Sequence, residues 1–255
     1  MRLNKALATA GVCSRRKADD LVFAGKVAVN GITAVSPGMQ VDPYNDIITV
    51  FGKPVAFLSS RGESTGHVYY MLNKPVEVVS TVSDPQGRRT VLDLLPEEAR
   101  RRRVYPVGRL DYFSEGLLLL TTDGDLTYRL THPSFHLPKV YEVLVRGHVT
   151  PGKLAAMSKG MTLTEGEKLA PVKARVVSTP NPVGRTLLEM TLIQGINRQI
   201  RRMCRDLELT VLKLRRIKDG PLTLGSLPTG QTRALTSAEV RALREFVGLT
   251  TCLSG

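Results

Sequence analysis

The sequence predicts an α+β protein of two units: a small N-terminal one, and a larger one built on a mainly antiparallel, mixed sheet flanked by helices. Residues 1–57 combine two short helical patterns with a hairpin signal. Residues 58–66 are rich in Ser and Gly, which is typical of a linker. From residue 67 onward short strand patterns outnumber helical ones, without the regular strand–helix alternation of a parallel sheet.

The first unit is predicted to begin with two short helices. Apolar residues recur at helical spacing from Leu3 to Ala10, and Gly11 is the expected end of that helix. Ser14 is the expected N-cap of the second helix. An Asn-Gly pair at residues 30–31 predicts a tight hairpin turn, and residues 46–55 a closing strand.

The larger unit, residues 67–248, carries many short strand patterns. They fall at residues 69–75, 77–82, 116–122, 141–147, 174–179, 186–193 and 210–217. Helical patterns fall at residues 126–130, 151–158, 198–206 and 237–247. Residues 249–255 are expected to be a frayed tail.

Charge is the strongest global feature: 36 Lys and Arg against 23 Asp and Glu give a net charge of +13. A basic protein without a polybasic tail or membrane signal most often binds nucleic acid, although a solvated basic surface is the alternative. Three scattered cysteines suggest a reducing compartment, and the lack of a recognisable targeting signal favours the cytoplasm, with an organelle as the alternative. The four histidines lack metal-ligand spacing, and we expect no metal and no membrane span.

Three cations, Arg15, Arg16 and Lys17, fall in the first turn of the second predicted helix. The helix dipole disfavours cations there, so an external anion is the favoured interpretation, with a solvated helix end as the alternative. The stretch "SRRKADDLVFAGKVAVNG" resembles the alpha-L RNA-binding module, a small domain also found in a ribosomal protein. That resemblance implies RNA contacts from these three cations and from Asn30.

Asp111 lies in "VGRLDYFSEGLLLL", just ahead of an apolar run that predicts a buried strand. A turn residue or strand-end cap is one interpretation. An ionised acid beside a core otherwise needs a cationic partner or a chemical task. No second carboxylate is placed as glycoside hydrolysis requires, and no group of acids converges as in a metal-dependent nuclease. A lone Asp favours covalent or base chemistry, kept ionised by an arginine.

A basic segment near the C-terminus could supply that arginine. Residues 195–218 carry eight Lys and Arg against two acids. Four arginines at helical spacing flank an apolar stripe, so at least one could point inward while others follow phosphates. A solvated basic helix is the alternative.

Several segments, in order behind the alpha-L module, resemble the ribosomal pseudouridine synthases: "LNKPVEVVSTVSDPQGRRTVLDLLP", "GRLDYFSEGLLLLTTDGDL", "RLTHPS", "KVYEV" and "GINRQIRRM". The resemblance covers residues 1–245 and implies a cofactor-free isomerase that detaches, rotates and rejoins uracil. Asp111 matches the essential aspartate, Tyr141 the tyrosine that stacks on the base, and Arg201 the arginine that pairs with the aspartate. Arg109 matches a residue that holds the flipped nucleotide. Further RNA contacts are expected from Lys139, Arg198 and Arg202.

The segment from residue 69 to residue 96 leans towards the large-subunit branch of that family, type B in particular. Two residues depart from the family pattern: Glu77 stands where a glycine is usual, and Ser114 replaces a threonine. A small-subunit target is the alternative within the enzyme class. A non-catalytic ribosome-binding or assembly protein and a DNA-binding regulator are the alternatives outside it. The expected partner is ribosomal RNA or a pre-ribosomal particle, bound by a monomer.

Overall fold

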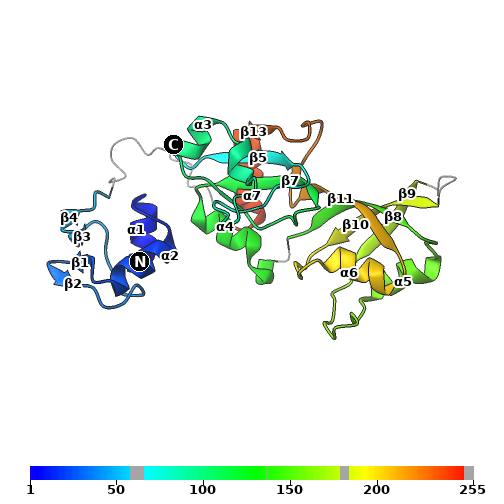
Figure 1. Ribbon diagram of the computed structural model, residues 1–255, viewed down its shortest axis with the longest axis horizontal. Coiled ribbons are helices and arrows are strands. Elements are labelled where there is room, and N and C mark those ends of the chain that lie inside the picture. The colour runs from blue at the N-terminus through cyan, green and yellow to red at the C-terminus, as the bar shows by residue number, and fades with distance from the viewer. Residues whose placement is uncertain (58–65, 136, 179–183, 250–255) are drawn as a thin grey trace. The chain divides into compact units, whose positions relative to one another are not determined.

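The computed structural model describes residues 1–57, 66–135, 137–178 and 184–249 (Figure 1). The chain divides into two compact units, Met1–Gly66 and His67–Gly255. Both combine helices with a largely antiparallel sheet, which confirms the predicted α+β class. The predicted linker lies outside the described residues except for Gly66, and the predicted tail except for Leu249.

The first unit packs two helices against one small sheet. Its helices are α1 (Leu3–Thr9) and α2 (Arg15–Phe23). Its strands, in the order β2-β1-β3-β4 across the sheet, are β1 (Val27–Val29), β2 (Ile32–Thr33), β3 (Ile48–Val50) and β4 (Lys53–Pro54). The helices and strands share one core of buried aliphatic side chains.

The predicted local signals of this unit are confirmed. The Ser14 hydroxyl accepts a hydrogen bond from the Lys17 backbone N–H at 3.2 Å, as an N-cap does. Gly11 follows α1 with a φ of 72°. Asn30 and Gly31 both have positive φ, 52° and 79°, which is the requirement of the tight turn between β1 and β2.

The second unit is built on one large sheet, with the path β13-β5-β7-β11-β8-β10-β9. Its strands are β5 (Tyr69–Lys74), β6 (Tyr105–Pro106), β7 (Glu115–Thr121), β8 (Lys139–Arg146), β9 (Lys173–Ser178), β10 (Arg185–Leu192), β11 (Thr210–Asp219), β12 (Leu222–Thr223) and β13 (Thr232–Ala234). The pairing of β7 with β11 is parallel, and the other strand pairings among the described residues are antiparallel.

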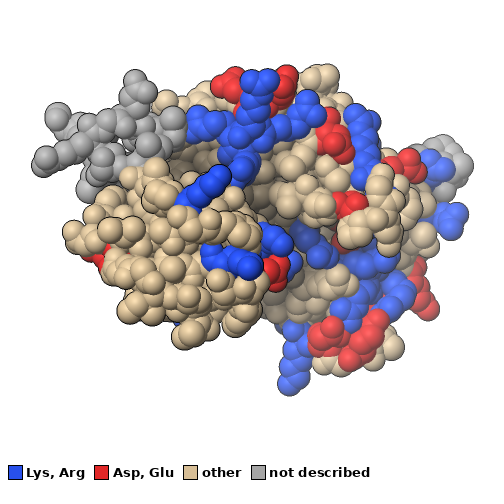
Figure 2. Space-filling model, turned by 60° about the vertical axis from the view of Figure 1, so that its left-hand side comes forward, with Lys and Arg blue, Asp and Glu red and all other residues tan. Residues whose placement is uncertain are grey.

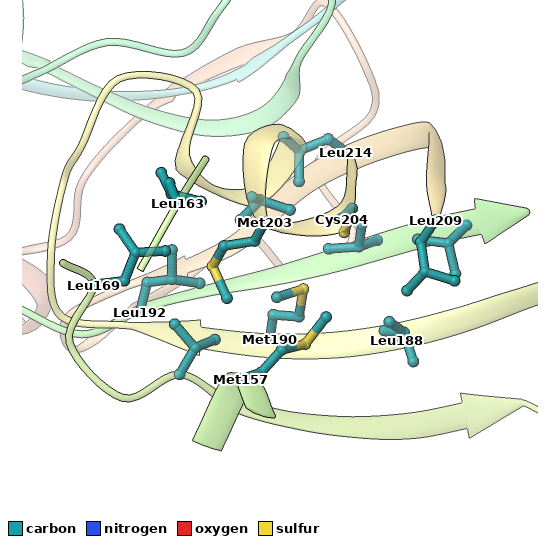
Figure 3. Packing of buried hydrophobic residues seen from close by; sticks show 14 residues of the cluster. Met157, Leu163, Leu169, Leu188, Met190, Leu192, Met203, Cys204, Leu209 and Leu214 are labelled. Carbon is teal, nitrogen blue, oxygen red and sulfur yellow. The ribbon is translucent and has the colours of Figure 1, made fainter. Parts of the chain in front are cut away.

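Different helices cover the two halves of this sheet (Figure 1). The helices are α3 (Glu97–Arg101), α4 (Gly124–Thr131), α5 (Pro151–Lys159), α6 (Gln199–Asp206) and α7 (Ser237–Phe246), with 3-10 turns η1 (Val91–Leu94) and η2 (Pro133–Phe135). Strands β5 and β7 are covered on one face by α4 and α7 and on the other by η1 and α3. Helices α5 and α6 pack on β8 and β10, around the cluster shown in Figure 3.

One predicted strand is wrong. Residues 77–82 form no strand, and the only ladder contact there is an isolated bridge between Val79 and Thr90. The chain turns at Glu77, which has a φ of 62°, a conformation that glycine adopts at less cost. The Glu77 N–H donates to the Tyr112 carbonyl at 2.7 Å. The segment is therefore used to hold the loop around Asp111 rather than to extend the sheet.

Candidate active site

Asp111 lies in the turn that leads into β7, and its side chain is half-buried. The Ser114 N–H donates to the Asp111 carbonyl at 3.0 Å and closes the turn. Every carbonyl from Leu110 to Ser114 accepts a hydrogen bond. Because the donors come from three separate segments, the backbone that carries the carboxylate is held in one place.

Lys74, the last residue of β5, supplies two of these contacts. Its ammonium is buried and donates to the carbonyls of Pro75 at 2.9 Å, Asp111 at 3.2 Å and Ser114 at 2.9 Å. Burial lowers the pKa of Lys74 to about 8, although the carboxylates of Asp111 and Glu115 act to raise it. Its charge therefore sits beneath the turn, within electrostatic reach of the Asp111 carboxylate.

The remaining contacts come from the loop after β5 and from α6. The Ser80 hydroxyl donates to the Leu110 carbonyl at 2.9 Å and accepts from the Leu110 N–H at 3.2 Å. The Arg201 guanidinium donates to the Phe113 carbonyl at 2.7 Å. Helix α6, at the far end of the sequence, is thereby joined to the Asp111 turn.

The parallel pairing of β7 with β11 brings the basic C-terminal segment to this turn. Arg216 of β11 lies opposite Gly116 of β7 and opposite Tyr141 of β8. The backbone of Arg216 approaches Gly116 so closely that a Cβ there would lie 2.2 Å from the Arg216 oxygen. Glycine is required at this position for the two strands to meet.

The structure brings the three predicted catalytic residues together. Burial lowers the pKa of Arg201, and the nearby charge of Asp111 acts to raise it. Burial raises the pKa of Tyr141, which packs between two hydrophobic clusters, and Asp111 contributes to that rise. Asp111 is therefore within electrostatic reach of both side chains, and the hydrogen bond of Arg201 goes to Phe113.

The predicted RNA-contacting residues of this unit have different surroundings. Arg109 is exposed, and Arg198 is exposed at the start of α6 with a φ of 49°. Arg202 is engaged by the carboxylates of Glu165 and Glu167, which together hold its pKa well above the usual range. The Arg202 guanidinium is therefore already paired with carboxylates of this chain rather than presented to RNA.

Lys139, the fourth of these predicted contacts, is mostly buried. Its ammonium donates to the Leu137 carbonyl at 3.3 Å and lies 3.9 Å from the Asp219 carboxylate. Burial lowers the pKa of Lys139. Its surroundings are those of an internal cation beside β11 rather than of a surface contact to RNA.

In the first unit the predicted cations are exposed. Arg15, Arg16 and Lys17 are all exposed at the start of α2, where Lys17 lies 4.0 Å from Asp20. The Asn30 side chain is occupied: it donates to Asp46 at 2.9 Å and accepts from the Ile47 N–H at 2.8 Å. On the face of the molecule in Figure 2, Lys and Arg cover more of the surface than Asp and Glu.

The residues described by the structure contain no group of three or more His, Cys, Asp or Glu side chains arranged to hold a metal ion. Within the same residues, no helix is both long enough and apolar enough to cross a membrane.

Sequence reasoning missed Lys74, Ser80 and Arg216 as parts of the site. For Lys74 a signal exists, because a lysine that ends an apolar strand pattern and precedes a proline is unusual in a sheet interior. Ser80 falls within a predicted strand, and Arg216 is one of four cations between residues 213 and 218. Nothing in the local pattern separates Arg216, which is buried, from Arg215, which is partly exposed.

Lys74→Met is expected to destabilise the second unit by about 3 kcal/mol or more, because three carbonyls lose the Lys74 ammonium as a donor and only that of Asp111 keeps the Ser114 N–H among the contacts of the turn described above. Chemical denaturation measures this, with the exposed Lys53→Met as control.

The folded-state pKa of Lys74 lies near 8, below the ordinary 10.5, so between these values the unfolded state holds the extra proton. The stability of the native protein relative to Lys74→Met should therefore rise from pH 8 to 10.5, and a flat difference would contradict the assignment.

The fold and the site together define an enzyme whose site has a carboxylate on a hydrogen-bonded turn, with a partly buried phenol and a guanidinium within its electrostatic reach. The same chain carries a small basic unit of the RNA-binding type. Comparison with known families gives the particular class. Residues 68–206 match the RNA pseudouridylate synthase family, and residues 1–47 match the S4 domain. The chain belongs to the RNA pseudouridylate synthase family.

Individual relatives match along nearly the whole chain. An uncharacterized RNA pseudouridine synthase of Aquifex aeolicus is 41% identical over 250 residues, covering 98% of this chain and 96% of the relative. The ribosomal large subunit pseudouridine synthase B of Bacillus subtilis is 40% identical over 243 residues, with 95% of each chain covered. A crystal structure of a pseudouridylate synthase superposes with a TM-score of 0.66 at 28% identity, covering 95% of this chain and 99% of that one.

Proposed function

We propose that this protein isomerises a uridine to pseudouridine in large-subunit ribosomal RNA, with Asp111 as the catalytic aspartate. The observation that carries the proposal is the anchored Asp111 turn with Tyr141 and Arg201 in electrostatic reach. Membership of the family supports the reaction. The similarity to the Bacillus subtilis large-subunit synthase supports the class of substrate.

Asp111 acts on the ribose of the target nucleotide, either as nucleophile or as base. The bond between the sugar and ring nitrogen 1 breaks, the uracil rotates, and a bond to ring carbon 5 forms. Carbon 5 loses its proton and nitrogen 1 gains one, so the reaction needs no oxidant or reductant. Arg201 and Lys74 place two cations within electrostatic reach of the Asp111 carboxylate.

A uridine stacked in an RNA helix is out of reach, so it must leave the stack before reaction, at a cost of a few kcal/mol. Arg109 is exposed two residues before Asp111, where it can fill the gap left by the flipped nucleotide. Tyr141 provides an aromatic surface for the free uracil and accepts the carbon 5 proton.

RNA binding is assigned to exposed cations in both units. Arg15, Arg16 and Lys17 contact phosphates from the first unit, and Arg198 contacts the RNA near the reacting uridine. We assign residues 1–57 to RNA binding and residues 67–248 to catalysis, with 58–66 as the connection. The protein is proposed to act as a monomer in the cytoplasm, on ribosomal RNA or a pre-ribosomal particle.

Tritium release tests the reaction directly. Large-subunit and small-subunit ribosomal RNA, and precursor particles of each, are labelled at carbon 5 of uracil and incubated with the native protein. Isomerisation transfers that hydrogen to water, whereas binding alone does not. Release from large-subunit RNA is expected. Release confined to small-subunit RNA would correct the substrate, and no release from any RNA or particle would favour a non-catalytic ribosome-binding role.

The double substitution Arg15→Glu and Arg16→Glu should weaken RNA binding and lower its dependence on salt. Loss of two phosphate contacts is expected to reduce the slope of log K against log salt by about 2. Binding titrations at several salt concentrations measure this. The matched control is Lys26→Glu with Lys53→Glu, which changes the charge of the same unit equally at exposed positions outside α2. Equal slopes for the two variants would contradict the phosphate contacts assigned to α2.

A further inference from the structure

Arg216 is a buried arginine next to the proposed catalytic tyrosine. Its side chain is 2% exposed, and it lies directly across the strand pair from Tyr141. Its Nε donates to the Leu117 carbonyl at 2.8 Å, and its Nη2 lies 3.5 Å from the Asp219 carboxylate. Contacts to β7 and β11 therefore hold the guanidinium, while Tyr141 extends from β8.

The charged groups around Tyr141 have opposite effects on the pKa of its phenol. Burial raises the pKa of the Tyr141 phenol, and the carboxylates of Asp219 and Asp111 add to the rise. The charge of Arg216, which lies directly opposite Tyr141 across the strand pair, acts in the lowering direction. Of these three side chains, one comes from the turn before β7 and two come from β11, and Lys139 of β8 lies 3.9 Å from the Asp219 carboxylate.

An internal cation is a costly way to stabilise a fold. Hydrophobic side chains of similar volume often replace a buried ion pair without loss of stability. This pair is also incompletely hydrogen-bonded: among the described residues neither Arg216 Nη2 nor Asp219 Oδ1 has a hydrogen-bond partner. Buried polar atoms without hydrogen-bond partners lower the stability of a fold, so a contribution to stability does not account for this ion pair. A functional effect on Tyr141 accounts for it better.

We propose that Arg216 is a positioning residue for Tyr141, orienting the phenol oxygen and stabilising its ionised form, with Asp219 as the counter-charge that limits this effect. The inference rests on the role proposed above for Tyr141. In the step concerned, the Tyr141 phenolate oxygen takes the proton from carbon 5. The electron pair of the broken C–H bond returns to the ring, and the phenol later loses the proton to water.

Removal of Arg216 and removal of Asp219 should shift the pKa of Tyr141 in opposite directions. Removing the cation in Arg216→Gln should raise the pKa of Tyr141, and removing the anion in Asp219→Asn should lower it. Each shift is expected to be about one unit or more, since a close charge moves a buried group by that amount. The probe is 3,5-difluorotyrosine placed at position 141, whose phenol ionises closer to neutral pH and is followed by fluorine NMR. Folding of each variant is checked by circular dichroism.

Arg215→Gln is the matched control, because Arg215 is the neighbouring residue on β11 and pairs instead with Glu115 and Glu142. It should leave the titration of position 141 unchanged. Opposite shifts in the two test variants support the proposal. Shifts in the same direction, as general damage to the fold would cause, or no shift in either variant, overturn it. Should Arg216→Gln fail to fold, Asp219→Asn and Arg216→Lys decide the question.

Activity supplies a second readout. Arg216→Gln should lower kcat for tritium release by about tenfold or more at neutral pH, with KM little changed, and Arg216→Lys should restore part of the loss. A rise in KM alone would overturn the proposal. The experiments distinguish failure of the proposed function from failure of the role of Arg216. If the native protein releases tritium but the titration of position 141 does not shift in the variants, only the role of Arg216 is refuted. Absence of release by the native protein refutes the proposed function, whatever the titration shows.

Discussion

Asp111→Asn is expected to lower the rate of isomerisation by about 10⁴-fold or more, while RNA binding survives. The substitution removes the charge and keeps the size of the side chain. The contacts that hold the turn go to its backbone, from Lys74, Glu77 and Arg201, so the turn should keep its shape. Chemistry should be lost because an amide can serve neither as nucleophile nor as base on the sugar.

Single-turnover tritium release and RNA-binding titrations, run on the same preparation, separate the two effects. Asp125→Asn is the control, since Asp125 is exposed in the first turn of α4, beyond the other end of β7. It should retain native activity. Normal turnover by Asp111→Asn would show that Asp111 is structural, whereas loss of both binding and turnover would show that the RNA site depends on its charge.

Gly116→Ala should destabilise the second unit by about 4 kcal/mol or more, or prevent it from folding. Gly116 has a φ of 106°, which L side chains rarely adopt. An added Cβ would lie 2.2 Å from the oxygen and 2.7 Å from the nitrogen of Arg216. Both are backbone atoms of the paired strand β11, so no side-chain rotation relieves the clash.

Gly225→Ala separates the clash from the backbone strain. Gly225 also has a positive φ, 61°, but nothing lies within 4 Å of a Cβ built there. Its substitution should cost about 1–2 kcal/mol, the penalty of a left-handed conformation alone. Urea unfolding of both variants measures the difference. Equal losses would mean that β7 and β11 can move apart at no cost, contrary to the tight pairing described above.

Local features of this chain were predictable from its sequence because their causes lie within a few residues. The cap at Ser14 depends on one hydroxyl and the next turn of helix, and the turn at Asn30 on two residues that accept positive φ. Amphipathic helices and the apolar β7 were predictable for the same reason. The segment at 77–82 was misassigned because its alternation resembles a strand, while its backbone bonds go to the turn around Asp111.

By itself, then, the sequence determined the two-unit α+β organisation, the basic α2, and Asp111, Tyr141 and Arg201 as candidates, the last two through resemblance to a family. Only the tertiary structure decided which charges meet. It placed Lys74 beneath the Asp111 turn and buried Arg216 beside Tyr141, while it paired Arg202 with surface carboxylates. The physical reason is that burial and charge pairing arise between segments far apart in sequence, here through one parallel strand pair that a glycine makes possible.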